Sequence, residues 1–190
     1  MSTTLPGNAE LTLDTATLEA ERQRLRVAYW APLLAVLTAD LLTKTLAASN
    51  LALWHPPRPV LGDVLRFALA YNPGIAFGWH IGPASRPVFS LLALLVLLVL
   101  FQLYRTTSAG DTPRALALGL ICGGAIGNLS DRIRSTRGVV DFIDIGIGDA
   151  RWWTFNLADV GVGLGALLLI RILWRAEAPE PAAPTDPAPS

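Results

Sequence analysis

Charged side chains are scarce in this sequence, and several catalytic residue types are nearly absent. Only 16% of the 190 residues are charged, whereas 52% are hydrophobic. Cysteine and lysine each occur once, as Cys122 and Lys44. No glutamate lies between Glu21 and Glu177, so carboxylate chemistry over that stretch has to come from aspartate.

These gaps exclude several classes of function. His55 and His80 lie in loop-like sequence without metal-ligand spacing and away from the polar residues described below, which argues against a metal site and a Ser-His mechanism. No basic run is interleaved with aromatics, so nucleic acid is not an expected partner. Cys122 lies in the apolar segment LGLICGGAIG and is interpreted as a buried thiol. We therefore expect no metal and no cofactor.

Long apolar runs dominate the chain instead. A helix needs about 20 mostly apolar residues to cross a hydrocarbon core of about 30 Å. Four stretches approach that length, and we predict helices at about 27–47, 87–104, 114–131 and 157–174. A basic stretch before the first run resembles a signal peptide, but Asp40 and Lys44 near its end favour a retained helix. The predicted fold is an all-α membrane protein with four antiparallel transmembrane helices.

The remaining segments define the domain organisation. Residues 1–25 and 176–190 are predicted to be solvated tails, the second because it is rich in Pro and Ala, and residues 26–175 are predicted to form the helical domain. Two longer loops, 48–86 and 132–156, connect the helices. The first contains LRFALAYNPG, whose alternation before an Asn-Pro-Gly turn predicts a small β-like cradle between the first two helices.

With four crossings, every unexpected polar residue near an apolar run falls on the same face of the membrane. Ionisable residues in membrane helices usually mark functional sites. The arginines divide about evenly between the two faces, so the positive-inside rule gives no orientation. The polar residues concerned are Asp40, Lys44, Asn72, Asn128, Asp131, Arg132, Asp141, Asn156 and Asp159.

Two short motifs within this set repeat one spacing. NLSD at 128–131 ends the third predicted helix, and NLAD at 156–159 begins the fourth. Glycines 123, 124 and 127 in one helix and 161, 163 and 165 in the other would let the two backbones approach closely. Asp159 could cap its helix, but Asn156 is already placed to do so, which would leave Asp159 free to face inward.

The residues leave the acidic partner of Asp159 open. Asp40 has Lys44 four residues away, and Asp131 lies among arginines, so cations are expected to keep both ionised; Asp63 and Asp149 look solvated. Asp141 and Asp144 remain, both flanked by apolar residues. Two carboxylates held close in a low-dielectric pocket share one proton, and such a pair can hydrolyse an amide.

Five motifs occur in an order that resembles lipoprotein signal peptidase (signal peptidase II). They are DLLTK at 40–44, NPGIAFG at 72–78, GGAIGNLSDR at 123–132, VVDFID at 139–144 and FNLAD at 155–159. The resemblance covers roughly residues 27–175. It implies a bacterial inner-membrane aspartyl endopeptidase, a multi-pass protein that removes the signal peptide of a prolipoprotein before a diacylglyceryl-modified cysteine.

Carried over by position, the resemblance implies a catalytic pair of Asp141 and Asp159. It also implies an active site and cradle on the outer face, cytoplasmic termini, and lipid-modified prolipoproteins and membrane lipid as partners of an expected monomer. Trp54, Trp79, Trp152 and Trp153 would be interfacial anchors. The residues implied to contact substrate are Asn72, Gly74, Asn128, Arg132 and Asn156, while Asp40, Lys44 and Asp131 would hold the shape of the site.

Two other classes fit part of the pattern. Intramembrane Asp, Asn and Lys residues also mark the paths of proton- or ion-coupled transporters. A path would need polar groups in both halves of the bilayer, whereas the half opposite the polar cluster is almost purely Leu, Val, Ala and Ile. A non-enzymatic scaffold protein, in which the two Asn-x-x-Asp motifs would be structural, is the other alternative.

Overall fold

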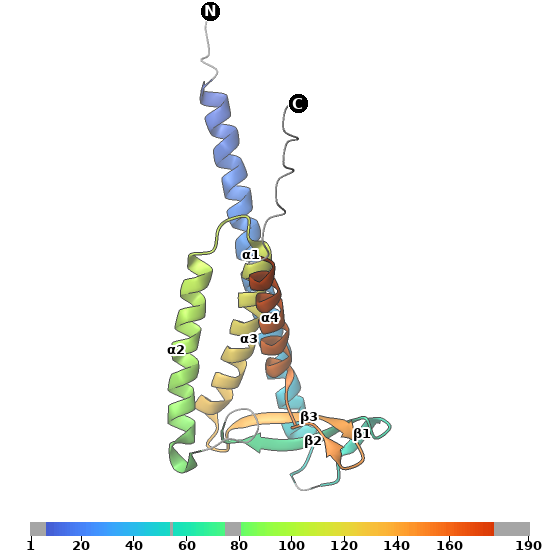
Figure 1. Cartoon of the computed structure of the whole chain (residues 1–190). Helices are drawn as coiled ribbons and strands as arrows, with labels where there is room; N and C mark the ends of the chain where they lie inside the picture. The colour runs from blue at the N-terminus through green and yellow to red at the C-terminus, as the bar shows by residue number, and fades with distance from the viewer. Residues whose placement is uncertain (1–6, 54, 75–80, 177–190) are drawn as a thin grey trace, which may run out of the picture.

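The computed structural model describes residues 7–53, 55–74 and 81–176. Within these residues, a bundle of helices stands on a small antiparallel sheet (Figure 1). The helices are α1 (Gly7–Asn50), α2 (Ser85–Arg105), α3 (Thr112–Arg134) and α4 (Leu157–Ala176), and a short 3-10 turn, η2 (Gly82–Ala84), leads into α2. The strands are β1 (Arg58–Leu61), β2 (Leu65–Asn72), β3 (Val139–Ile147) and β4 (Ala150–Arg151).

Helix α1 begins about twenty residues earlier than predicted. It starts at Gly7, whereas the sequence predicted the first helix at about 27–47. The segment LEAERQRLR, at 18–26, consists largely of strong helix formers, and these extend the helix ahead of its long apolar run. Figure 1 shows α1 extending beyond the ends of the other helices.

Three of the described helices are long and apolar enough to span a membrane, namely those in Thr15–Asn50, Gly82–Arg105 and Leu157–Arg175. Helix α3 does not qualify by composition, although it contacts each of the other three helices. Its buried positions are mainly Ala and Gly, with Leu118 and Cys122 among them. Ala and Gly have a lower hydropathy than Leu or Val, and they suit a helix that packs against other helices on several sides. The other three helices expose more of their surface and carry larger apolar side chains there.

Close backbone approach explains most of the glycines in α3 and α4. A Cβ on Gly123 would lie 2.6 Å from the carbonyl oxygen of Leu33, and one on Gly165 would lie 2.6 Å from that of Ala117. On Gly124 it would collide with the carbonyl oxygen of Ala158. Gly163 is the exception, because a Cβ there would have no atom within 4 Å. The interpretation of Gly163 as a packing glycine was therefore wrong.

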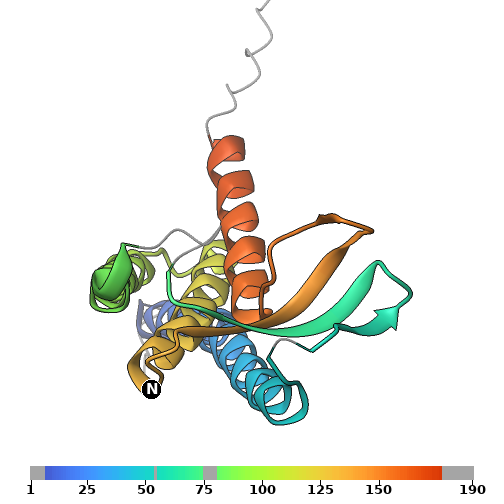
Figure 2. The ribbon, with the colours of Figure 1, turned by 90° about the horizontal axis from the view of Figure 1, so that it is seen from below.

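The sheet joins the two long loops. Its strand order is β1-β2-β3-β4, and β2 pairs antiparallel with β3 so that Ala70 lies opposite Asp141. The prediction placed a cradle between the first two helices alone and missed β3 and β4. The run VVDFIDIGI has little alternation because several consecutive side chains are buried, so a period-2 pattern does not reveal it. Figure 2 shows the strands crossing the end of the bundle and projecting to one side.

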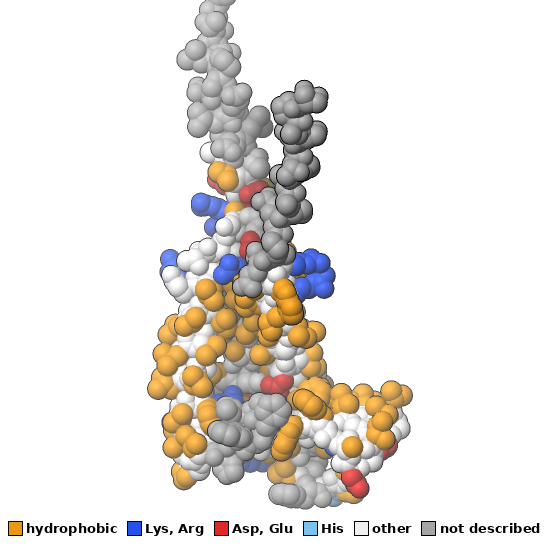
Figure 3. All heavy atoms as spheres, viewed as in Figure 1, with side chains coloured by type: hydrophobic (Ala, Val, Ile, Leu, Met, Phe, Trp, Pro, Cys, Tyr) orange, Lys and Arg blue, Asp and Glu red, His pale blue; other side chains and the backbone are white. Residues whose placement is uncertain are grey.

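The end of the bundle away from the sheet holds the apolar core. Leu25, Tyr29 and Leu118 are buried there together with Cys122, as predicted for its thiol. Tyr104 of α2 stacks on Tyr29 with ring centroids 3.8 Å apart. Outward-facing leucines and valines cover the described surface of the helices with hydrophobic side chains (Figure 3). This belt is the surface expected to face lipid.

Candidate active site

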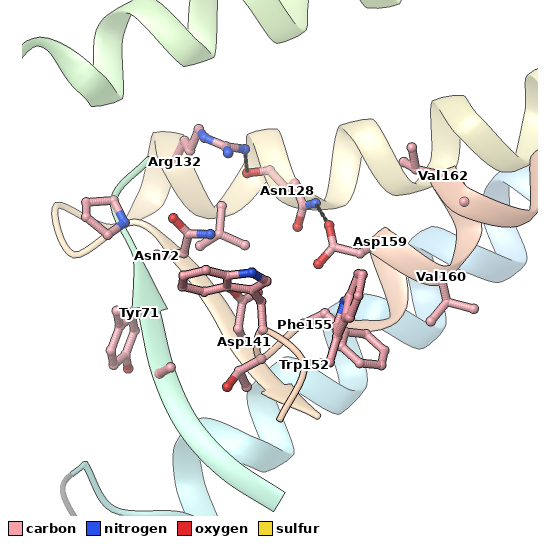
Figure 4. Close-up of a pocket in the computed structure, with 16 residues that line it drawn as sticks. Tyr71, Asn72, Asn128, Arg132, Asp141, Trp152, Phe155, Asp159, Val160 and Val162 are labelled. Carbon is pink, nitrogen blue, oxygen red and sulfur yellow. Dashed lines mark hydrogen bonds between the residues drawn. The ribbon is translucent and has the colours of Figure 1, made fainter. Parts of the chain in front are cut away.

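The polar residues of the two Asn-x-x-Asp motifs meet beside the sheet, where α3 ends and α4 begins. A cavity of about 760 Å³ opens there, and both Asp141 and Asp159 line it (Figure 4). Two backbone hydrogen bonds between Ile143 and Phe155, of 2.8 and 3.0 Å, hold the entry of α4 against β3. The other lining residues are Ala70, Tyr71, Asn72, Pro73, Asn128, Arg132, Val139, Trp152, Trp153, Thr154, Phe155, Val160, Val162 and Gly163.

Asp159 lies in the first turn of α4 and takes part in its cap. Its Oδ2 accepts a hydrogen bond from the backbone N–H of Asn156 at 3.2 Å, and the Oδ1 of Asn156 accepts one from the N–H of Asp159 at 3.0 Å. This reciprocal pair is a capping box built from Asn and Asp. The prediction that capping by Asn156 leaves Asp159 out of the cap was therefore wrong. Asp159 nevertheless reaches the cavity.

Asp141 lies in β3 and is almost fully buried, with 4% of its surface exposed. Its Oδ1 accepts a 2.6 Å hydrogen bond from the side-chain amide of Asn156. Burial, reinforced by the nearby charge of Asp159, raises the pKa of Asp141 to about 7, although hydrogen bonds from Asn156 and Asn72 oppose the shift. Asp141 is thus a carboxyl group that can hold a proton near neutral pH.

Two asparagines connect the carboxyl groups to the rest of the site. Asn156 is fully buried and binds Asp141 through its side chain and Asp159 through its backbone. The Nδ2 of Asn128 donates to Oδ1 of Asp159 at 2.8 Å (Figure 4), and the Oδ1 of Asn128 accepts a hydrogen bond from Asn156 at 3.1 Å. Asp159 therefore accepts hydrogen bonds at both oxygens.

Lys44 is bound by three acceptors behind Asn128. Its ammonium lies 2.7 Å from Oδ2 of Asp40, 2.9 Å from Oδ2 of Asp131 and 2.8 Å from Oδ1 of Asn128. Asp131 thus pairs with Lys44, and the expectation that arginines neutralise it was wrong because α1 packs against the end of α3. Oδ1 of Asp40 accepts the backbone N–H of Ala158 at 2.9 Å, so this ion cluster also fixes the start of α4.

Arg132 joins the cavity to the turn that follows β2. Its guanidinium donates to the carbonyl oxygen of Gly74 at 2.9 Å and to that of Asn128 at 3.2 Å. Asn72 in turn accepts the N–H of Gly74 at 3.0 Å. Gly74 therefore lies beside the cavity, held through its backbone. Residues 75–78 of the NPGIAFG motif, together with Trp54 and Trp79, lie outside the described residues.

Asp144 points away from the two carboxyl groups of the cavity. Its carboxylate is bound by Arg66 at 2.8 Å and by Arg151 at 2.6 Å. Burial alone would raise the pKa of Asp144, but the two guanidinium groups outweigh it and hold the pKa below its usual value. Asp63 is half exposed and bonds to Arg66 at 3.0 Å, so the view of Asp63 as merely solvated was also incomplete. Asp144 of β3 thus binds β2 through Arg66 and β4 through Arg151.

Asp144→Asn is therefore expected to retain whatever catalytic activity the cavity supports, within about tenfold of the wild type. It should cost about 1.5–3 kcal/mol of stability, because it weakens hydrogen bonds to two charged groups. With its lowered pKa, Asp144 stabilises the fold at neutral pH, and this contribution is lost as the pH falls through the lowered value. Turnover and thermal unfolding in detergent measure the two effects. Complete loss of turnover in a folded variant would make Asp144 part of the chemistry.

Some residues of the site carried no sequence signal. Arg86, at the start of α2, donates to the carbonyl oxygens of Arg132 at 2.5 Å and Ile133 at 2.9 Å and so caps the end of α3. Arg66, in the predicted cradle, and Arg151, in the predicted loop 132–156, were likewise not singled out. Only the pairing of distant segments reveals these three arginines. Among the described residues, no group of three or more His, Cys, Asp or Glu side chains could hold a metal ion.

Comparison with known proteins gives one consistent result. The family model for signal peptidase (SPase) II matches residues 33–175. A lipoprotein signal peptidase of Rhodococcus jostii (strain RHA1) is 41% identical over 143 residues, which are 71% of this chain and 66% of that protein. One of Streptomyces coelicolor is 37% identical over 164 residues, 84% of this chain and 76% of the relative.

A solved structure also resembles the fold. It is a bacterial membrane enzyme determined by the in meso method at 2.3 Å resolution. The TM-score is 0.71 at 25% sequence identity, and the match covers 82% of this chain and 92% of the other. The bundle and sheet described above are therefore an arrangement already seen in a membrane enzyme.

Proposed function

Because this chain belongs to the signal peptidase II family, we propose that it removes the signal peptides of prolipoproteins with Asp141 and Asp159 as an aspartic catalytic pair. The bond cleaved precedes the diacylglyceryl-modified cysteine. The observation that carries this proposal is that Asn156 binds both carboxyl groups at the edge of one cavity. Two carboxyl groups that share one proton and one cavity are suited to amide hydrolysis.

The environment of each carboxyl group assigns its role. Asp141 is buried and holds the proton, whereas Asp159 accepts two hydrogen bonds at the start of a helix, where the dipole favours negative charge. Asp159 removes a proton from water as the oxygen attacks the scissile carbonyl carbon, and Asp141 donates its proton to the carbonyl oxygen. A gem-diol results, with Asp159 protonated and Asp141 ionised.

Collapse of this intermediate restores both groups. Asp159 gives its proton to the nitrogen of the leaving amine as the C–N bond breaks, and Asp141 takes back the proton of one hydroxyl group as the carboxylic acid product forms. Arg132 lies at the same cavity, where its positive charge favours a substrate carbonyl oxygen that gains electron density. The cycle consumes one water molecule and needs no metal ion.

Activity is expected to fall as the pH rises above about 7. The proposed mechanism needs one proton on the pair, and the raised pKa of Asp141, about 7, marks where that proton is lost. Each further pH unit should lower kcat/KM about tenfold. A profile from pH 5 to 9 with a lipopeptide substrate measures this, with incubation at each pH followed by assay at pH 6 as a control for inactivation. A rate that stays constant from pH 6 to 9 would contradict the assignment of the proton to Asp141.

The site also supports a membrane topology. We propose that α3 is a fourth crossing, since it packs between helices that are apolar enough to span. The two termini leave the bundle at the end opposite the sheet (Figure 1). We propose that this end is cytoplasmic and that the sheet and cavity face outward, as the resemblance to signal peptidase II implies.

This topology suits the proposed substrate, because a diacylglyceryl-modified prolipoprotein is itself anchored in the bilayer and presents its cleavage site at the interface.

The alternative of a proton- or ion-coupled transporter gains no support from the comparisons. The direct test is cleavage of a diacylglyceryl lipopeptide by the purified protein, with the same peptide lacking the lipid as control. Proton or ion flux in liposomes without proteolysis would favour the transporter instead. We predict a monomer, which light scattering in detergent measures.

A further inference from the structure

Gly163 lines the cavity but has no packing reason to be glycine. It lies in the interior of α4, where glycine destabilises a helix relative to alanine. A Cβ on Gly161 would lie 2.6 Å from Cγ1 of Val36, and Gly165 packs against Ala117, so these two permit close helix contact. A Cβ on Gly163 would meet open space. The missing side chain thus enlarges the cavity and nothing in the described chain fills the gap.

The position of the gap indicates what it can hold. Gly163 is one helical turn beyond Asp159, about 6 Å along the axis at about 1.5 Å per residue. Moving from Asp159 to Gly163 leads away from the sheet and into the apolar part of α4. Val160 and Val162 line the cavity beside Gly163 (Figure 4). Leu167, four residues after Gly163 and so one helical turn further on, is exposed on the lipid-facing surface. The gap is therefore apolar and continuous with the lipid-facing belt.

We propose that Gly163 leaves a notch beside Asp159 that receives one acyl chain of the lipid-modified cysteine. This inference rests on the proposed function and names a specificity-determining residue for it. The lipid is attached to the residue directly after the scissile bond, so its chains must return to the hydrocarbon from a point next to the catalytic pair. Along the cavity wall formed by α4, Gly163 follows Val160 and Val162 on that return path, one helical turn beyond Asp159.

The attachment point of the lipid, directly after the scissile bond, favours an acyl chain as the occupant of this exposed face of the cavity, where a Cβ on Gly163 would meet open space. A hydrocarbon chain is no thicker than an extended leucine or methionine side chain and fits such a space. Trp152, Trp153 and Phe155 also line the cavity and complete an apolar surface for it.

Photo-crosslinking identifies the occupant. Two lipopeptides are prepared, one with a diazirine early in an acyl chain and the other with a diazirine-bearing leucine in the signal peptide, and each is irradiated with wild-type enzyme. The acyl probe is expected to label α4 within residues 160–167, and Gly163→Leu should reduce that labelling at least about tenfold. Labelling of this segment by the signal-peptide probe alone would overturn the proposal.

Kinetics supply a second measurement. Gly163→Leu fills the notch, and we expect KM for a dipalmitoyl lipopeptide to rise at least about tenfold, with kcat little changed and Gly163→Ala intermediate. The matched control is Leu164→Phe, which adds bulk on the same helix at a position that is 55% exposed and does not line the cavity. Its KM should match that of the wild type. An unchanged KM in Gly163→Leu would overturn the notch.

Different outcomes overturn the proposed function and the notch at Gly163. If wild-type enzyme does not cleave the lipopeptide at all, the proposed function is wrong, and the notch falls with it. If wild-type enzyme cleaves and Gly163→Leu cleaves equally well with unchanged acyl labelling, the proposed function stands and only the notch is wrong. Misfolding of Gly163→Leu is detected by its melting temperature, and Gly163→Ala, which improves helix propensity, remains available as a test.

Discussion

Replacing either Asp141 or Asp159 by asparagine is expected to lower cleavage of a diacylglyceryl lipopeptide on the order of 10³-fold or more. Asparagine is nearly isosteric with aspartate but can neither accept the proton of water nor deliver one to the leaving amine. The two substitutions remove different steps of the same cycle, so the double variant should lose little more than either single variant. Single-turnover assays of purified protein measure the chemical step directly.

The controls for this prediction come from the same site. Asp144→Asn removes a carboxylate from the same strand but leaves the cavity intact, since Asp144 is held by Arg66 and Arg151. A folded Asp159→Asn protein with near wild-type turnover would show that the carboxylate serves only the helix cap, where its Oδ2 accepts the N–H of Asn156. Undiminished turnover in Asp141→Asn would equally refute the pair.

Lys44→Met is expected to destabilise the protein by about 3–5 kcal/mol, because it leaves buried charges without their partner. Lys44 is 3% exposed and Asp40 is fully buried, and both Asp40 and Asp131 lie within 3 Å of the ammonium group. Without the cation, the two carboxylates repel each other, and the start of α4 loses the support that Asp40 gives it. Denaturant unfolding in detergent micelles measures the loss.

A matched pair of variants separates the ion cluster from general damage. Arg175→Met removes a cation from an exposed position at the opposite end of the bundle and should change stability by less than about 0.5 kcal/mol. Combining Lys44→Met with Asp131→Asn removes one of the unpaired charges and should recover part of the stability. If Lys44→Met were as stable as Arg175→Met, the contacts of Lys44 with Asp40, Asp131 and Asn128 would contribute no net stability, and the cluster would not hold the site together.

The helical architecture could be predicted from the sequence because it depends on composition over long windows. Runs of about 20 apolar residues give helices in lipid whatever their neighbours are, since every backbone polar group must be satisfied within the segment. The predicted cores of all four helices match observed ones, while the start of α1 was misplaced by about twenty residues. The polar composition of residues 7–26 is compatible both with a solvated helix and with an irregular tail, so composition did not reveal that α1 starts at Gly7.

The sequence also determined which polar residues lie near one end of the bundle, and the order of the motifs determined the family. The residues themselves left Asp141 and Asp144 equivalent as partners of Asp159, because both sit in one apolar run. Only the tertiary structure decided that Asp141 shares a cavity with Asp159 while Asp144 meets two arginines. The physical reason is that alternate residues of a strand point to opposite faces of the sheet, so Asp141 and Asp144 of β3 point in opposite directions. Which of the two lies beside Asp159 depends on the register of β3 with β2 and on the packing of β3 against α4. Both are contacts between segments that are far apart in the sequence.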